Sequence, residues 1–278
     1  MKTQKTIPVP ATVPTIRDVN EHWKVAGPQL AADIGSKRDL QVEGLLDSTI
    51  GVFSFVIGRH HKKRTKNLHL AGRLEPLVIL GFEVLRGAHS AQLVGSLATA
   101  ALCSRTEFEA CVTLKYITDS DSDKRADLFD RFQYAERLKQ HQEGLRPLQP
   151  ADVQRLSTLC PEWRDKNGTV PLNSKWHARK KFSFKDMADE VGELSSYQTL
   201  YSLGSLFTHG SAVIKNLYRQ GNDLVAVADP KHVRVQSIVT ITLALALLQT
   251  YGEFFGIPLP ADCFDVLRKQ INSAAVAK

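Results

Sequence analysis

Apolar residues recur at intervals of three and four along most of this chain, and this spacing places side chains on one face of an α-helix. Helices are predicted over residues 15–35, 38–60, 71–87, 89–118, 122–142, 151–159, 183–192, 194–218, 231–255 and 261–273. Only the short run 223–229 alternates in the manner of a strand, and it could form a hairpin arm or a surface loop. We therefore expect an all-α fold, with a loop over 161–182, where Asn167, Gly168 and Pro171 are turn signals.

Local signals indicate where some of these helices begin. One helix is expected to start close to Pro76, because proline is tolerated in a first turn. Asp121 and Ser122 offer capping side chains to the helix that follows them. Ser183 and Asp186 have the spacing of a capping box, with Asp in place of the usual Glu or Gln.

The most apolar stretch, Val235–Gly252, contains no charged residue and is just long enough to be considered for crossing a bilayer. Polar residues are spread along its whole length, at Gln236, Ser237, Thr240, Thr242 and Gln249. We therefore interpret residues 233–255 as the central apolar helix of a single multi-helix bundle and expect no membrane contact. The bundle is expected to occupy residues 15–278 as one domain, preceded by an extended arm over residues 1–14.

Composition agrees with a folded domain and adds a preference for acidic partners. The chain has 278 residues, of which 43% are hydrophobic and 23% charged, so a sizeable core is expected. Its net charge of +7 favours RNA or DNA as a partner. Basic residues cluster in the run 59–69 and at Lys175, Arg179, Lys180, Lys181 and Lys185. Either cluster could equally be a solvated surface.

Motifs for several common chemistries are absent from the sequence. It contains no Walker A loop, no dinucleotide-binding G-x-G-x-x-G, no G-x-S-x-G and no H-E-x-x-H. The four cysteines, Cys103, Cys111, Cys160 and Cys263, form no C-x-x-C pair and are expected to be free thiols. The sequence therefore indicates no cofactor. The N-terminal segment lacks the apolar run of a signal peptide, so a cytoplasmic location is expected.

A stripe of polar residues lies along one predicted helix that is otherwise apolar. Tyr201, Ser205 and His209 are spaced by four, which places the three side chains one above another. They would supply two hydroxyl groups and an imidazole, and His209 could act as a general acid or base. His209 could equally be a core histidine that donates to Glu109 or to a carbonyl.

Two other predicted helices carry polar side chains on one face. Arg105 and Glu109 are four apart on a largely apolar face, so we expect the pair to be partly buried. It could be a structural ion pair, or it could line a polar site. Arg131 and Tyr134 are three apart on a second helix. We expect Arg105 and Glu109 to face the stripe that begins at Tyr201, with Arg131 and Tyr134 closing the cluster.

The basic run 59–69 contains a further candidate pair. Arg64 and His69 match the pattern R-x-x-x-x-H, which resembles the ribonuclease signature of the helical HEPN superfamily. The resemblance implies an arginine and a histidine that together handle a 2′-hydroxyl and a phosphate. In so basic a run, the same two residues are also typical of a solvated helix end.

An ordered set of motifs over residues 85–215 resembles an uncharacterised bacterial family of all-α proteins whose function is unknown. The motifs are R-T-x-F-E at 105–109, R-F-x-Y at 131–134, K-W at 175–176 followed by F-K-D-M-A-D-E, and Y-x-x-x-S-x-x-x-H at 201–209. The resemblance implies a polar site made of Arg105, Glu109, Arg131, Tyr134, Tyr201, Ser205 and His209. By analogy with other helical proteins, it also suggests a defence or toxin component.

These observations lead to two classes of function. In the first, the protein is a ribonuclease-like or nucleic-acid-binding effector, for example of phage defence, in which His209 transfers a proton and Arg105 or Arg131 holds a phosphate. In the second, it is a non-enzymatic helical module that binds a partner protein or a small ligand through a buried polar cluster. A metal site built from Glu109 and His209 is a third hypothesis.

Overall fold

The computed structural model describes residues 39–60, 68–179, 181–201, 229–257, 259 and 261–276, the backbone of residues 219–220 and 223–224, and a few isolated positions. The arm predicted over residues 1–14 lies outside this part of the chain. Of the helix predicted over 15–35, the described positions Lys24, Pro28, Ala32 and Gly35 are helical.

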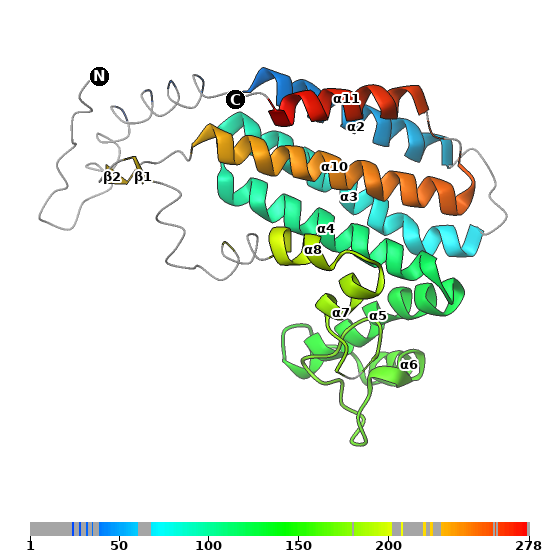
Figure 1. The fold of residues 1–278 in the computed structure, drawn as a ribbon. Coiled ribbons are helices and arrows are strands. Elements are labelled where there is room, and N and C mark those ends of the chain that lie inside the picture. The colour runs from blue at the N-terminus through cyan, green and yellow to red at the C-terminus, as the bar shows by residue number, and fades with distance from the viewer. Residues whose placement is uncertain are drawn as a thin grey trace, which may run out of the picture.

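Long helices form the body of the protein. They are α2 (Leu40–His60), α3 (Leu68–Val94), α4 (Leu97–Asp119), α10 (Pro230–Phe255) and α11 (Ala261–Val276). In Figure 1 they run side by side with α10 in the middle, and α10 packs against α2, α3, α4 and α11. This arrangement confirms the prediction of an all-α bundle around a central apolar helix.

Further elements lie on the other side of α4, in the lower part of Figure 1. They are α5 (Ser122–Gln142), α6 (Pro150–Leu159), the 3₁₀ turn η1 (Pro161–Trp163), α7 (Phe184–Glu190), α8 (Leu194–Ser196) and the π-helical turn η2 (Tyr197–Tyr201). α5 packs against α3, α4 and α6, whereas α7 and η2 pack against α4. Apart from these helices, β1 (Arg219–Gln220) and β2 (Asp223–Leu224) form a short antiparallel pair, so the run 223–229 begins as a hairpin arm.

One predicted helix start is wrong, because tertiary packing overrides a local signal, and one predicted side-chain cap does not form although its helix starts at Ser122 as predicted. α3 begins at Leu68 and continues through Pro76, because Leu74 and Leu77 on either side of the proline are buried in the core. Proline inside a helix costs roughly 3 kcal/mol, which the packing of this long helix offsets. Asp121 does precede α5, but its backbone is left-handed, with φ of 48°, and its side chain makes no capping hydrogen bond.

Other helix ends follow from their local sequence. The capping box is confirmed, since Ser183 Oγ accepts from the Asp186 N–H (3.2 Å) and Asp186 Oδ2 accepts from the Ser183 N–H (2.6 Å). The break between α3 and α4 falls later than predicted, at Gly95 and Ser96. Gly95 has φ of 66°, a left-handed conformation that glycine adopts without steric cost. Ser96 Oγ then accepts from the Thr99 N–H (3.3 Å) and caps α4.

Polar side chains inside the bundle bond to one another where α10 meets its neighbours. Ser104 Oγ on α4 donates to Gln236 Oε1 (2.6 Å), and Ser237 Oγ donates to Gln92 Oε1 on α3 (3.2 Å). All four residues are buried. These bonds explain how polar residues are accommodated within α10. By length and composition alone, α2, α3 and α10 are each apolar enough to cross a membrane.

Glu107 is the most unusual residue of this core. It lies on the face of α4 that packs against α3 and α10, and it is fully buried. A Cβ atom at Gly81 would lie only 2.8 Å from Glu107 Oε1, so α3 and α4 approach closely here. In the described part of the chain, neither carboxylate oxygen of Glu107 has a hydrogen-bond partner. Burial therefore raises the pKa of Glu107 to about 8.

The buried carboxyl of Glu107 should make stability depend on pH. In the unfolded chain its pKa is 4.5, against about 8 in the folded protein. Between these values the folded state binds the extra proton, so the free energy of unfolding should fall as pH rises, by roughly 1.4 kcal/mol per pH unit. We expect Glu107→Gln to flatten this decline and to unfold at a higher temperature than the parent protein at pH 8.5.

Thermal unfolding followed by circular dichroism from pH 5 to pH 9 measures this effect. Glu83→Gln is the matched control, because Glu83 is exposed on α3 and pairs with Arg86 at the surface. Parallel pH curves for Glu107→Gln and the parent protein would contradict the assignment.

Candidate functional site

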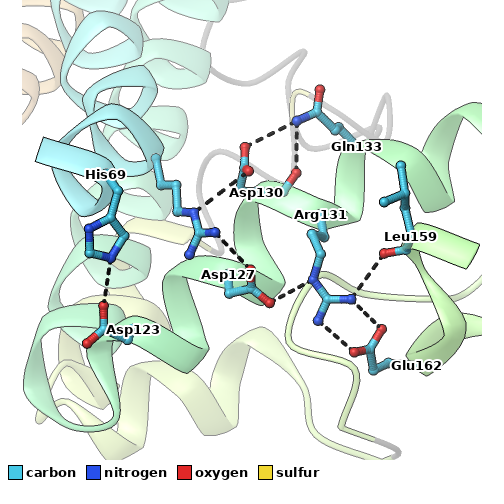
Figure 2. Close-up of polar contacts among 9 residues, drawn as sticks. His69, Asp123, Asp127, Asp130, Arg131, Gln133, Leu159 and Glu162 are labelled. Carbon is cyan, nitrogen blue, oxygen red and sulfur yellow. Dashed lines mark hydrogen bonds and ion pairs between the residues drawn. The ribbon is translucent and has the colours of Figure 1, made fainter. Parts of the chain in front are cut away.

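Arg131, one of the predicted site residues, belongs to a chain of ion pairs along α5, as Figure 2 shows. Arg131 Nε donates to Asp127 Oδ2 (2.7 Å), and its two terminal nitrogens donate to the Glu162 carboxylate (2.6 and 2.9 Å). Arg131 also donates to the Leu159 carbonyl (3.0 Å). Arg73 of α3 bonds to the other oxygen of Asp127 (3.0 Å). The chain therefore ties α3, α5 and η1 together.

Within this chain, the pKa of Glu162 is lowered from its ordinary value. Burial acts to raise it, but the hydrogen bonds and the charge of Arg131 outweigh that effect. Tyr134 packs against a neighbouring apolar cluster that contains Leu156 and Trp163. The described contacts of Arg131 and Tyr134 thus lie between α5, α6 and η1. The structure shows no contact of Arg131 or Tyr134 with the described members of the predicted cluster.

His69 lies at the start of α3, where its Nε2 is 3.1 Å from Asp123 Oδ1 of α5 (Figure 2). Both side chains are well exposed. Arg64, its partner in the R-x-x-x-x-H pattern, lies outside the described residues. The described contact of His69 is with an acidic side chain at the end of the bundle.

Three of the predicted residues do come together. Arg105 Nε donates to Glu109 Oε1 (3.1 Å), and a terminal nitrogen of Arg105 donates to the Tyr201 hydroxyl (2.8 Å). The guanidinium carbon also lies 4.3 Å from the centre of the Tyr201 ring, within cation–π range. The side chain of Arg105 is 17% exposed and that of Glu109 is 40% exposed. Ser205 and His209, the remaining members of the Tyr201 stripe, lie outside the described residues.

Glu109 and Tyr201 form part of the wall of a cavity of ≈ 340 Å³, which we call the aromatic cavity. Its lining comprises Glu109, Thr113, Phe132, Glu136, Ser174, Lys175, Trp176, His177, Phe184, Met187 and Tyr201. Four elements contribute: α4, α5, the loop before α7, and the segment from α7 to η2. Burial and then the charge of Glu109 raise the pKa of the Tyr201 hydroxyl, so this group remains a hydrogen-bond donor at neutral pH.

His177 is a cavity residue that the sequence analysis did not identify. It is 4% exposed, and its Nδ1 accepts from the Arg179 backbone N–H (3.2 Å). Burial, together with the charges of Lys175 and Arg179, lowers the pKa of His177 to about 4. The imidazole is therefore neutral at pH 7, and the bond to Nδ1 leaves its single proton on Nε2.

A second cavity of ≈ 580 Å³, which we call the basic cavity, adjoins the first and shares Ser174 and Lys175 with it. Its lining comprises Glu162, Trp163, Arg164, Asp165, Pro171, Asn173, Ser174, Lys175, Ala178, Arg179, Lys181, Phe182 and Ser183. The Arg179 guanidinium lies 3.6 Å from the centre of the Phe182 ring. The basic cluster at the loop before α7 therefore contributes to a concave surface. Its members Lys175, Arg179 and Lys181 line the basic cavity. Ala178 and Lys181 both have left-handed backbones, with φ of 54° and 63°.

The signals that could have identified this region were short ones. The K-W pair and the F-K-D-M-A-D-E motif surround it in sequence, and Trp176 and Phe184 line the aromatic cavity.

Among the described residues, no group of three or more His, Cys, Asp or Glu side chains is placed to hold a metal ion. All four cysteines are free, and only Cys263 is exposed.

We expect Arg105→Ala to reduce the free energy of unfolding by about 2 kcal/mol, because Arg105 stacks on Tyr201 and donates to two partners. Arg155→Ala is the control, since the Arg155–Asp152 pair is exposed and should contribute less than about 0.5 kcal/mol. Urea denaturation of both variants measures the difference. Equal losses for the two arginines would show that the contacts of Arg105 contribute little to folding.

A model of one protein family matches part of the chain. Residues 94–223 match a family of unknown function, DUF5677. The predicted resemblance to an uncharacterised helical family is thereby confirmed over this segment. No curated protein and no solved structure matches the chain. All residues that line the two cavities fall within the matched segment.

Proposed function

We propose that this protein, which carries a DUF5677 segment over residues 94–223, is a cytoplasmic effector that binds single-stranded RNA through the basic cavity. The observation that supports the proposal most directly is the charge of that cavity. Arg164, Lys175, Arg179 and Lys181 line it. Arginine and lysine side chains that converge on a concave surface are suited to phosphate groups.

The acidic side chains of the basic cavity are already engaged. Both carboxylate oxygens of Glu162 accept from Arg131. Asp165 Oδ1 accepts from the backbone N–H groups of Asn167 and Thr169 (2.8 and 2.9 Å). Arg131 offsets the charge of Glu162, and the backbone N–H groups stabilise that of Asp165. Arg179 is itself paired with Glu190 (3.0 Å), so Arg164, Lys175 and Lys181 provide most of the positive charge for an anionic ligand.

The aromatic side chains favour a single strand over a duplex. Phe182 lines the basic cavity and Arg179 stacks on it, whereas Trp163 is buried in the apolar cluster behind the cavity, so Phe182 and Arg179 provide the stacking surface. Unpaired nucleotides can enter a concave site and stack on aromatic or guanidinium planes, whereas the bases of a duplex are already stacked on each other. The left-handed backbones of Ala178 and Lys181 fit a functional loop, because such conformations cost about 1–2 kcal/mol per residue and persist where the surroundings impose them.

Removing positive charge from the basic cavity should weaken RNA binding and reduce its dependence on salt. We expect the double variant Lys175→Ala/Lys181→Ala to lower the magnitude of the slope of log K against log salt by about 1.4, which is about 0.7 for each lost phosphate contact on a single strand. Fluorescence anisotropy with a labelled single-stranded RNA, measured from 50 to 300 mM salt, gives the slope.

Lys269→Ala is the control for this experiment. Lys269 is an exposed lysine of α11, and Figure 1 shows α11 at the opposite side of the molecule from α7. If the double variant and Lys269→Ala change the slope equally, non-specific charge explains the binding and the basic cavity is not the site.

A catalytic step is the second part of the proposal, and it rests on His209 as the general acid or base. The part of the predicted site that the structure describes offers Arg105 and the Tyr201 hydroxyl beside Glu109. We expect His209→Ala to abolish cleavage of RNA while leaving its binding within about twofold, because proton transfer contributes to rate and not to ground-state affinity. His232→Ala, on an exposed histidine of α10, is the control. Equal cleavage by His209→Ala and the parent protein would remove the catalytic claim and leave the binding claim intact.

A non-enzymatic ligand-binding module is the alternative, and one observation favours it. Arg105 is packed onto Tyr201 and bonded to Glu109, which is the arrangement of a structural cluster at a cavity wall. A role in phage defence belongs to the first proposal and follows from analogy with other helical effectors.

A further inference from the structure

We infer that the aromatic cavity is a guanine pocket that receives the base of a nucleotide whose phosphate lies in the basic cavity. The inference rests on the proposed function and adds a base preference to it. The first observation is that the two cavities are neighbours, because Ser174 and Lys175 line both. One nucleotide can therefore place its phosphate and its base in adjoining spaces with different chemistry.

The size and the walls of the aromatic cavity suit one flat ring system. Its volume is ≈ 340 Å³, at the lower end of the range for small-molecule pockets. Phe132, Trp176, Phe184 and Tyr201 come from different elements and line it together. The Tyr201 ring already stacks on Tyr197 and carries Arg105, so Phe132, Trp176 and Phe184 are the rings left for a ligand. Aromatic side chains stack on any base, so these walls would bind a nucleobase without choosing among the four.

Two carboxylates in the wall of the aromatic cavity provide selectivity among the bases. Glu109 Oε1 accepts from Arg105 and Glu136 Oε1 accepts from Lys139 (2.5 Å). In the described part of the chain, the second oxygen of each carboxylate accepts no hydrogen bond. A carboxylate only accepts when ionised, so this side of the cavity favours a ligand edge that carries N–H donors.

His177 supplies a hydrogen-bond donor, in contrast to the two accepting carboxylates. The Arg179 N–H donates to its Nδ1, and the low pKa keeps the ring neutral, so Nε2–H is a donor in the wall of the aromatic cavity. The hydroxyl groups of Thr113, Ser174 and Tyr201 can donate or accept, and they do not discriminate between edges.

Guanine is the base whose edge matches this set. Its Watson–Crick edge carries two adjacent donors, N1–H and the N2 amino group, beside the O6 acceptor. The oxygen that already accepts from Arg105 or Lys139 has a second lone pair, so one carboxylate can accept from both donors while a neutral histidine donates to O6. Adenine and cytosine place a ring-nitrogen acceptor where guanine has N1–H, which would face the carboxylate unpaired. Uracil has a single N–H between two carbonyl acceptors. Bidentate pairing of this kind discriminates between bases by about 1–3 kcal/mol.

Isothermal titration with GMP, AMP, CMP and UMP tests the inference on the full-length protein. We expect GMP to bind at least about tenfold more tightly than the other three, consistent with one bidentate pair. Glu136→Gln or Glu109→Gln should remove most of the preference for GMP while leaving the affinity for AMP within about twofold. Glu143→Gln, at the exposed end of the same helix α5, is the matched control and should keep the preference.

A second variant addresses the walls of the cavity. Phe184→Leu should weaken all four nucleotides alike, because it removes a stacking surface and no hydrogen-bonding group. Thermal unfolding of each variant is measured alongside, so that a loss of binding caused by unfolding is recognised, and nucleotide binding is compared only among variants that unfold at temperatures close to that of the parent protein.

The outcomes separate this inference from the function it rests on. A preference for GMP that Glu136→Gln or Glu109→Gln removes, with RNA binding retained, supports both. RNA binding through the basic cavity with equal affinity for the four nucleotides, or with a preference for another base, overturns the guanine pocket alone. Failure of both the RNA and all four nucleotides to bind the parent protein overturns the proposed function, and the guanine pocket with it.

Discussion

Burial of α4 against α3 and α10 is the constraint on which the rest of the structure depends. The inward face of α4 carries Glu107, which the packing forces into an environment without a described hydrogen-bond partner. The opposite face carries Glu109, which lines the aromatic cavity, and Arg105, which donates to it. Because one helix supplies both faces, the position of the cavity wall is fixed by the packing of the core. A cavity wall that forms part of a core helix is also rigid, as recognition of a flat ligand requires.

The ion-pair chain on α5 connects the core to the basic cavity in a second way. Arg73 of the bundle pairs with Asp127, and Asp127 in turn pairs with Arg131, which also pairs with Glu162. Glu162 is itself a lining residue of the basic cavity. Arg131 thus does more than hold η1 in place, because it offsets the charge of a carboxylate that would otherwise repel a phosphate. A residue outside the cavity in this way shapes the electrostatics inside it.

Periodicity located the helices well, because a helix that buries one face must repeat its apolar residues along the chain. The local preference of proline for a first turn misplaced one helix start at Pro76, where burial of neighbouring residues outweighs the cost of proline inside a helix. The pairing of Arg105 with Glu109 could be predicted because spacing by four brings two side chains together within one helix. The partners of Arg131 include Glu162, 31 residues away, and no local pattern indicates such a contact.

The residues of the loop before α7 were harder to predict for a related reason. A loop has no repeating pattern, so the burial of His177 depends on the aromatic rings that pack around it, including Trp176 and Phe182. The positive charge of this loop could be predicted from the sequence, but the concave surface that its basic residues line could not. Lys175 illustrates the difference, because the same lysine in a flat solvated loop would be only one more surface charge, whereas here it lines two cavities at once.

The two cavities together restrict the chemistry of a ligand more than either does alone. The basic cavity favours an anion, whereas the aromatic cavity offers two carboxylates and flat apolar walls. A simple anion would gain nothing from the aromatic walls, and a simple cation would be repelled by the basic cavity. A ligand that uses both must carry a negative group beside a flat ring with N–H donors. Lys175 would then lie between the two parts of the ligand, where a positive charge attracts the anionic group without displacing the ring.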